Sequence, residues 1–154
     1  MSKIKLSKQQ IGRAGGLLVQ YRLLKYGIDS APLTTDSGID LVAYSPLREE
    51  ALTIQVKTNA KPKPGGGKGA LALDWWLKRT SPADLVALVN LESEEVWLFT
   101  LEEFIEAAQQ QSDEISLHFY MYVDGGVKTR TGKKALKYQF SEYLLENAFH
   151  RIFI

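Results

Sequence analysis

Two short segments rich in β-forming residues, 39–44 (IDLVAY) and 52–58 (LTIQVKT), most constrain the fold of this chain. The loop between them contains Pro46, which lacks the N–H that a continuing strand would need. We therefore expect the two segments to pair as an antiparallel hairpin. Apolar and polar residues alternate along the second segment, so that its polar face carries Gln55 and Lys57.

The hairpin brings a third polar group, Asp40, close to Gln55 and Lys57. A carboxylate, an amide and an ammonium group on one face are costly to bury unless each finds a partner. One interpretation is a divalent cation held by oxygen atoms of Asp40, Gln55 and the backbone carbonyl of Val56, with Lys57 beside its bound water. The other is an ion pair between Asp40 and Lys57 with Gln55 hydrogen-bonded alongside. The residues alone leave both open.

A helix is expected before the hairpin, over residues 8–26, with Ser7 as its N-cap and Gly27 as its stop. Its buried stripe is predicted to contain Ile11, Ala14, Leu17, Leu18, Tyr21 and Leu24. Gly15 and Gly16 weaken a helix by about 1 kcal/mol each relative to Ala. They instead suggest a close approach of this helix to a strand.

The remaining elements follow from the same periodicities. Strands are expected at 84–90, 95–99 and 114–123 and helices at 100–111 and 141–149, while 71–77 fits either type. This order predicts an α/β (α+β) fold with a central mixed β-sheet flanked by helices. A chain of 154 residues without repeats or a linker is expected to form a single domain, 1–154. A basic hairpin around 128–137 and a helix, within about 114–154, would be appended to its core.

Composition excludes several classes of site. The chain has no Cys and two His, which rules out disulfides and thiolate metal sites and disfavours a zinc site. No apolar run approaches the length of about 20 residues needed to cross a bilayer. The basic N-terminus is followed by no apolar core, so a secretory signal is not expected. These features predict a cytoplasmic protein.

The formal net charge is only +1, but the charges are strongly segregated. Six Lys or Arg residues and no acid lie in 1–28, and six against one acid lie in 57–79. Residues 80–127 hold ten acids and no Lys or Arg, and 128–137 hold five basic residues. If the basic segments share a face, a phosphate backbone would respond to that local field. Separately solvated charges are the alternative.

The stretches Gly38-Ile39-Asp40-Leu41-Val42 and Gln55-Val56-Lys57-Thr58 resemble motifs II and III of the PD-(D/E)XK, or restriction-endonuclease-like, nuclease superfamily. The helix of residues 12–27, the segment 82–86 and the EVWLF hairpin strand extend this resemblance to roughly residues 8–105. It implies a restriction-endonuclease-like core. It also implies Asp40 as a metal ligand, Gln55 at the position usually held by an acid, and Lys57 as the catalytic lysine, with Mg²⁺ or Mn²⁺ as cofactor.

Two departures from the family pattern bear on activity. Gln55 replaces a carboxylate, and a neutral ligand binds Mg²⁺ less strongly. Many members also carry a metal-contacting Glu on the opening helix, where this chain has Gly16. Asp36 would add a second acid, although a turn residue is its simpler interpretation. A catalytically weak DNA-binding or assembly protein is therefore the alternative to an active enzyme.

The expected function is a metal-dependent DNA endonuclease of the restriction or homing type, acting on double-stranded DNA as a homodimer or higher symmetric oligomer. Arg130 is the predicted guanine reader, and Trp75 and Trp76 would either stack on bases or pack in the core. His118 is expected to be structural and His150 to lie on the surface. The predicted phosphate contacts are Lys8, Arg13, Lys61, Lys63, Lys68, Lys128, Arg130, Lys133 and Lys134.

Overall fold

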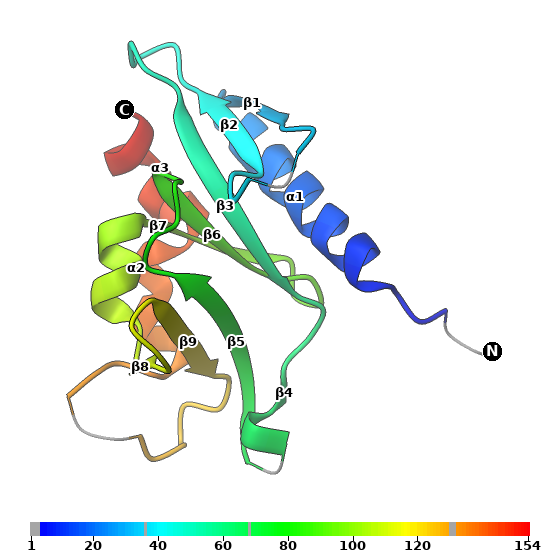
Figure 1. Cartoon of the computed structure of the whole chain (residues 1–154), viewed down its shortest axis with the longest axis vertical. Helices are drawn as coiled ribbons and strands as arrows, with labels where there is room; N and C mark the ends of the chain where they lie inside the picture. Colours follow the sequence, from blue (N-terminus) through cyan, green and yellow to red (C-terminus); the bar gives the residue numbers. More distant parts are fainter. Residues whose placement is uncertain (1–3, 36, 68, 130–131) are drawn as a thin grey trace.

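The computed structural model describes residues 4–35, 37–67, 69–129 and 132–154. Along these residues, α1 is followed by a long run of strands, and helices and strands are mixed in the C-terminal part (Figure 1). The elements are α1 (Lys8–Leu24), β1 (Asp29–Pro32), β2 (Leu41–Tyr44), β3 (Leu52–Asn59), β4 (Lys63–Pro64), the 3₁₀-helix η1 (Gly65–Gly67), β5 (Leu71–Lys78), β6 (Leu85–Asn90), β7 (Glu95–Thr100), α2 (Leu101–Ala107), β8 (Gln110–Gln111), β9 (Ser116–Tyr122), the 3₁₀-helix η2 (Lys137–Tyr143) and α3 (Leu145–Phe153).

The strands form two sheets. The first has the order β1-β2-β3-β6-β7, in which only the β3–β6 pair is parallel. The second has the order β4-β5-β9-β8 and is antiparallel throughout. The predicted class, an α+β fold with a central mixed sheet flanked by helices, is thereby confirmed. The second sheet is an addition that local periodicity did not reveal, because its two long strands come from distant parts of the chain.

Two hydrophobic clusters fill the opposite faces of the first sheet. The first cluster joins α1 and α3 to residues such as Ile54, Ala87 and Leu98, and is mainly aliphatic. The second joins the other face of β6 and β7 to β5, β9, α2 and η2, and is mainly aromatic. All six residues of β6 are buried because this strand is covered on both faces. In Figure 1, α1 lies beside β1, β2 and β3 on the right of the view, and α2 and α3 lie on the left.

Helix α1 starts as predicted. The Ser7 side chain accepts from the Gln10 backbone N–H, and the Gln10 side chain accepts from the Ser7 N–H, which completes a capping box. Gly27, with a φ of +80°, lies just beyond the end of the helix. The predicted buried stripe was wrong, however. The buried residues are Gly15, Val19 and Leu23, whereas three members of the predicted stripe, Leu17, Tyr21 and Leu24, are exposed.

The helix settles on this face because Gly15 allows it to approach β3 closely. A Cβ atom added to Gly15 would lie 1.8 Å from Oγ1 of Thr58, whereas one added to Gly16 would meet nothing within 4 Å. The expected close approach is therefore real at Gly15. The position of α1 is thus set by a glycine that permits close contact with β3, and not by the widest apolar stripe of the helix.

Residues 71–78 are a strand, and its alternation separates the two neighbouring tryptophans. Trp75 faces the second cluster and is buried, whereas Trp76 is 47% exposed on the outer side of the sheet. The same alternation in β9 buries Leu117, Phe119 and Met121.

The predicted basic hairpin at 128–137 is not formed by the described part of that segment. β9 ends at Tyr122, which pairs with Ala72 of β5 and meets the described part of 128–137 only in an isolated parallel bridge to Leu136. Instead of pairing, the chain is held against the C-terminal end of α2. The Lys133 ammonium donates to the carbonyls of Glu106 and Ala108, both at 2.8 Å, and Ala135 and Leu136 are buried.

Helix α2 ends at Ala107, four residues before the predicted end, since Gln110 and Gln111 pair with β9 instead. The C-terminal helix α3 contributes Leu145, Ala148, Ile152 and Phe153 to the first cluster. The region from 114 onward thus takes part in both clusters through β9 and α3. Within the described ranges, no helix has the length and apolar character needed to cross a bilayer.

Candidate functional site

The β2–β3 pair places Asp40 directly beside the middle of β3. Leu41 pairs with Ile54, so Asp40 lies opposite Gln55. The Asp40 N–H donates to the Ile54 carbonyl at 2.8 Å, and its carboxylate Oδ2 accepts from the Val56 N–H at 2.7 Å. Gly38, with a φ of +84°, makes the preceding turn and lies close to Pro82. Only glycine adopts that backbone without strain, so Gly38 helps to deliver Asp40 to β3.

The same register puts Asp40, Gln55 and Lys57 on one face of the first sheet. Gln55 and Lys57 neighbour Val86 and Leu88 of β6, and both of those residues belong to the second cluster. Residues directly opposite in an antiparallel pair also share a face, which adds Asp40 to this side. Helix α1 packs on the other face, against Thr58. The three residues singled out from the sequence are therefore brought together.

A cavity of about 540 Å³ opens beside these residues. Gln55 and Lys57 line it from β3, Trp76 and Lys78 line it from β5, and Ser81 and Pro82 line it from the loop before β6. The Ser81 hydroxyl donates to Gln55 Oε1 at 2.7 Å and fixes the amide. Sequence reasoning missed Ser81, because the only local signal, a Ser-Pro pair, is common in loops.

The ion-pair interpretation of this group is wrong. Within the described ranges, Asp40 and Lys57 form no ion pair with each other, and Lys57 has no ion-pair or hydrogen-bond partner. Asp40 is exposed, and its carboxylate has one hydrogen-bond partner among the described residues, the backbone N–H of Val56. The ammonium of Lys57 and one oxygen of Asp40 thus remain available to a ligand.

The oxygen atoms near Asp40 fit a hard divalent cation, although only one of these ligands is negatively charged. In an extended strand the N–H and C=O of one residue point to the same side. Since the Val56 N–H points at the Asp40 carboxylate, the Val56 carbonyl also faces that edge of β3. Asp40, Val56 and Gln55 then offer one carboxylate and two neutral oxygens. No group of three or more His, Cys, Asp or Glu side chains suited to a metal occurs in the described part of the chain.

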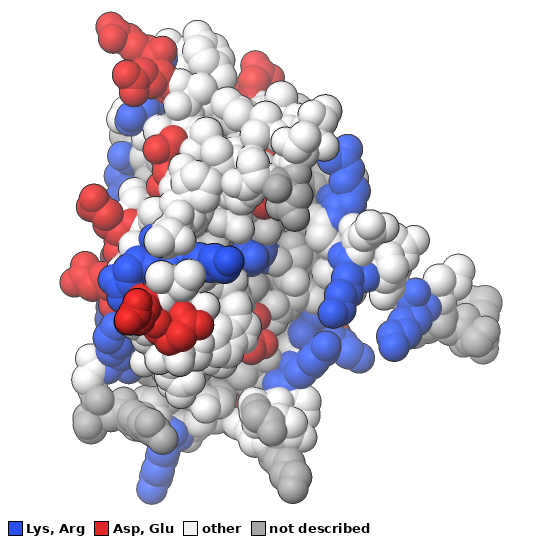
Figure 2. Space-filling view, viewed as in Figure 1, with Lys and Arg blue, Asp and Glu red and all other residues white. Residues whose placement is uncertain are grey.

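The predicted phosphate-contacting residues lie in different settings. Lys8, Arg13, Lys61, Lys63 and Lys128 are exposed. Lys133 is engaged by the end of α2, and Lys134 lies 3.8 Å from Glu142, so the structure disfavours these two as phosphate contacts. Lys68, Arg130 and Asp36 lie outside the described residues. On the face seen in Figure 2, the right-hand edge beside α1 carries Lys and Arg without Asp or Glu, whereas the left-hand edge mixes both signs.

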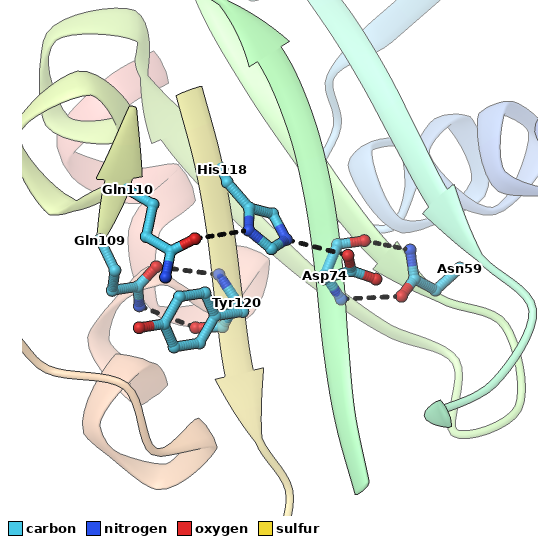
Figure 3. Close-up of polar contacts among 6 residues, drawn as sticks. All are labelled: Asn59, Asp74, Gln109, Gln110, His118 and Tyr120. Atoms are coloured by element: carbon cyan, nitrogen blue, oxygen red, sulfur yellow. Dashed lines mark hydrogen bonds and ion pairs between the residues drawn. The ribbon is translucent and has the colours of Figure 1, made fainter. Parts of the chain in front are cut away.

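A second polar group, which the sequence did not single out, lies on the outer face of the second sheet (Figure 3). His118 was expected to be structural, but its ring joins two side chains across that face. Its Nε2 lies 2.9 Å from Asp74 Oδ2 and its Nδ1 lies 3.4 Å from Gln110 Oε1. The alternation in 72–78 and 116–122 predicts which side chains share a face of each strand, but only the pairing of β5 with β9 brings His118 beside Asp74. His150 is exposed, as expected.

Comparison with known proteins bears on the fold alone. No protein-family model and no curated protein matches the chain. Among solved structures, the chain is similar to that of the bacterial homing endonuclease I-Ssp6803I, with 21% sequence identity and a TM-score of 0.59. The similarity covers 97% of this chain and 93% of the other. Together with the mixed central sheet and its flanking helices, it supports the restriction-endonuclease-like fold that the motifs predicted.

Proposed function

We propose that this protein is a metal-dependent DNA endonuclease that hydrolyses phosphodiester bonds, with Asp40, Gln55 and Lys57 as its catalytic group. The observation that carries the proposal is their register. Asp40, just before β2, lies opposite Gln55 of β3, and Lys57, which has no partner among the described residues, lies two residues further along the same face. The fold shared with a homing endonuclease supports a nuclease over other uses of such a group and favours the homing type over the restriction type.

Magnesium is the cofactor we propose, held by Asp40 with the Val56 carbonyl and Gln55, and manganese would substitute for it. Mg²⁺ prefers oxygen ligands and keeps several of its waters, so a site with three protein oxygens is sufficient. When bound, the ion would supply Lewis-acid stabilisation of charge on the phosphate.

The protein's own groups have separate tasks in hydrolysis. The Lys57 ammonium lines the cavity and has no ion-pair or hydrogen-bond partner among the described residues; there it orients the attacking water and stabilises the negative charge that grows on the phosphate. The water oxygen bonds to phosphorus and gives up one proton to solvent, the bond to the leaving oxygen breaks, and that oxygen takes one proton from solvent. Gln55 is held in one orientation by Ser81, which reduces the reorganisation needed when substrate binds.

The substrate we propose is double-stranded DNA, bound by exposed basic residues around the cavity and on α1. Lys8, Arg13, Lys61, Lys63, Lys68, Lys128 and Arg130 are the proposed contacts. Cleavage of both strands needs two active sites, so we propose a homodimer or higher symmetric oligomer.

A plasmid-nicking assay with Mg²⁺ or Mn²⁺ tests the catalytic assignment. Removal of a positioned general acid–base or charge-stabilising group costs about 100- to 10,000-fold in rate, which is the loss we expect for Lys57→Ala. Lys25→Ala, which removes an exposed lysine of the α1 C-cap, is the matched control and should nick at the wild-type rate. Equal nicking by wild type and Lys57→Ala, in protein free of contaminating nuclease, contradicts the assignment.

A catalytically weak DNA-binding or assembly protein is the second candidate. It is favoured by the shortage of carboxylates, since residues 1–28 contain no acid and Gln55 is neutral. In that case DNA binding would persist and fall with added salt, while no metal would support Lys57-dependent nicking.

A further inference from the structure

The outer face of the second sheet is a continuous polar and aromatic surface that the proposed hydrolysis does not use. Strands β5 and β9 pair over seven residues. Their inward side chains belong to the second cluster, whereas their outward side chains are exposed or half-buried apart from the buried Ala72. The flanking strands β4 and β8 have two residues each, so the surface is in effect a two-stranded ribbon. The outward residues are Ala72, Asp74, Trp76, Lys78, Ser116, His118, Tyr120 and Tyr122.

This surface is hollowed and has a basic rim. A hollow of about 790 Å³ is lined by Asp74, His118, Tyr120 and Tyr122. Lys63 lines it from β4, and Lys128 lines it from the segment that follows β9. Asp74 is the only acid among the lining residues, and His118 lies against its carboxylate. The combination of a basic rim and a polar floor is complementary to a phosphate backbone with base edges between its strands.

The polar groups of the hollow are held in place before any ligand binds. Trp76 stacks on the His118 ring at 4.1 Å with an interplanar angle of 3°, which limits rotation of the imidazole. The Gln109 amide bonds to both the N–H and the carbonyl of Tyr120, at 2.9 and 2.7 Å. Asp74 Oδ2 therefore projects from a fixed backbone next to a fixed ring, and its side chain remains 53% exposed (Figure 3).

The surface is joined to the candidate site both by contact and by the chain. Trp76 and Ser116 line the cavity that also contains Gln55 and Lys57. Asn59, at the end of the strand that carries those two residues, clamps the Asp74 backbone: its amide donates to the Asp74 carbonyl at 2.8 Å and accepts from the Asp74 N–H at 3.0 Å. A duplex lying on the ribbon would pass directly beside the proposed catalytic group.

We propose that the β5–β9 ribbon enters the major groove of duplex DNA and that Asp74 reads a base edge there, accepting a hydrogen bond from the exocyclic amino group of cytosine. The major groove admits a two-stranded ribbon, and carboxylates accept from cytosine in this way. His118 is a positioning residue that orients the carboxylate. The inference rests on the proposed function, because it says how the protein reads the duplex DNA that is its proposed substrate.

The test selects bound sequences from a randomised duplex library with wild type, Asp74→Asn, His118→Ala and the control Asp29→Asn, which alters an exposed carboxylate on a strand of the first sheet. We expect wild type and Asp29→Asn to select cytosine at one position. Asp74→Asn should lose about 5- to 150-fold of that preference and shift towards adenine, which asparagine recognises. His118→Ala should relax the same position, and circular dichroism checks that each variant is folded.

Three results overturn the inference: identical selections by wild type and Asp74→Asn, no selection by wild type, or a wild-type preference for single-stranded oligonucleotides, which would assign the exposed Trp76 to base stacking. Lys57-dependent nicking is scored separately on plasmid. An enzyme that nicks but selects without Asp74 leaves the proposed function intact, and a protein that selects through Asp74 without nicking leaves the inference intact.

Discussion

The candidate site and the outer face of the second sheet both contact β3, but through different kinds of hydrogen bond. At the site, a side chain binds backbone: the Asp40 carboxylate accepts from the Val56 N–H. On the outer face, Asp74 is held through its own backbone by the Asn59 amide, and its carboxylate is left to project outward. The Asp40 carboxylate thus bonds directly to β3 through one oxygen, whereas Asp74 is connected to β3 through its own backbone. Strand β3 is the common support, so substitutions along it should show which effects the two regions share and which are separate.

The largest effect is expected from Gly15→Ala, which acts on the back of β3. The added methyl group would lie within 3 Å of three Thr58 side-chain atoms, so rotation of Thr58 does not relieve the clash and α1 must move. Overpacking of this kind costs about 3 kcal/mol in the free energy of unfolding. Both regions should suffer together, with lower nicking and weaker base selection.

Gly16→Ala is the matched control, because its Cβ meets nothing within 4 Å. It should raise stability by up to about 1 kcal/mol, as the change removes a helical glycine. Urea denaturation measures both variants. A Gly15→Ala protein as stable as wild type would contradict the described approach of α1 to β3.

Asn59→Ala should separate the two regions. It removes two hydrogen bonds to the Asp74 backbone and so should cost about 2 kcal/mol in unfolding free energy, at roughly 1 kcal/mol for each bond. Base selection should weaken more than nicking at saturating DNA, since Gln55 and Lys57 remain in place. Asn147→Ala removes one side-chain bond, to the Ser141 carbonyl in the C-terminal region, and should lower stability without altering selection. Equal losses of selection and nicking in Asn59→Ala would mean that the two regions are one site.

Asp40→Asn should change the free energy of unfolding less than Asn59→Ala does. Its main effect should be on metal binding. An amide oxygen accepts from the Val56 N–H less strongly than a carboxylate, which costs about 1 kcal/mol. Wild type should gain thermal stability on addition of Mg²⁺, as any ligand of the native state stabilises it. Asp40→Asn should gain far less. A Mg²⁺-induced rise in Tm that is the same in both proteins would place the ion elsewhere.

The two regions also differ in how far the sequence predicted them. Asp40, Gln55 and Lys57 lie on consecutive paired strands, and alternation alone puts them on one face. The outer face depends on Asp74 meeting His118, 44 residues away. Local periodicity predicts the side of a strand on which each residue lies, but not its neighbour in another strand. For this reason His118 was predicted to be structural. The sequence thus predicted the residues of the proposed site and missed the surface beside it.

Errors elsewhere have the same origin. The predicted buried stripe of α1 was wrong because Thr58 and Gly15 decide which face of the helix approaches β3. The helix sequence alone does not predict that contact. The described part of 128–137 forms no hairpin, because Lys133 donates to the carbonyls at the end of α2 and holds this part of the chain there. In both cases a tertiary partner overrode a plausible local pattern.

The smallest effect concerns the turn that starts β9, and it tests whether the second sheet depends on pH independently of the candidate site. Asp113 Oδ1 accepts from the N–H groups of Ile115 and Ser116, at 2.8 and 2.7 Å, and these bonds lower the pKa of its carboxyl group below the ordinary value of 3.8. Because the folded pKa is the lower one, the stabilisation is complete above the unfolded value and is lost as the pH falls through the folded value. Urea denaturation at about pH 5 and about pH 3 should therefore differ slightly more for wild type than for Asp113→Asn, which keeps an acceptor but no ionisable group. Since Asp113 is fully exposed, the difference should be small and should shrink with added salt. Identical pH dependence in the two proteins would show that this turn contributes nothing to stability through its charge.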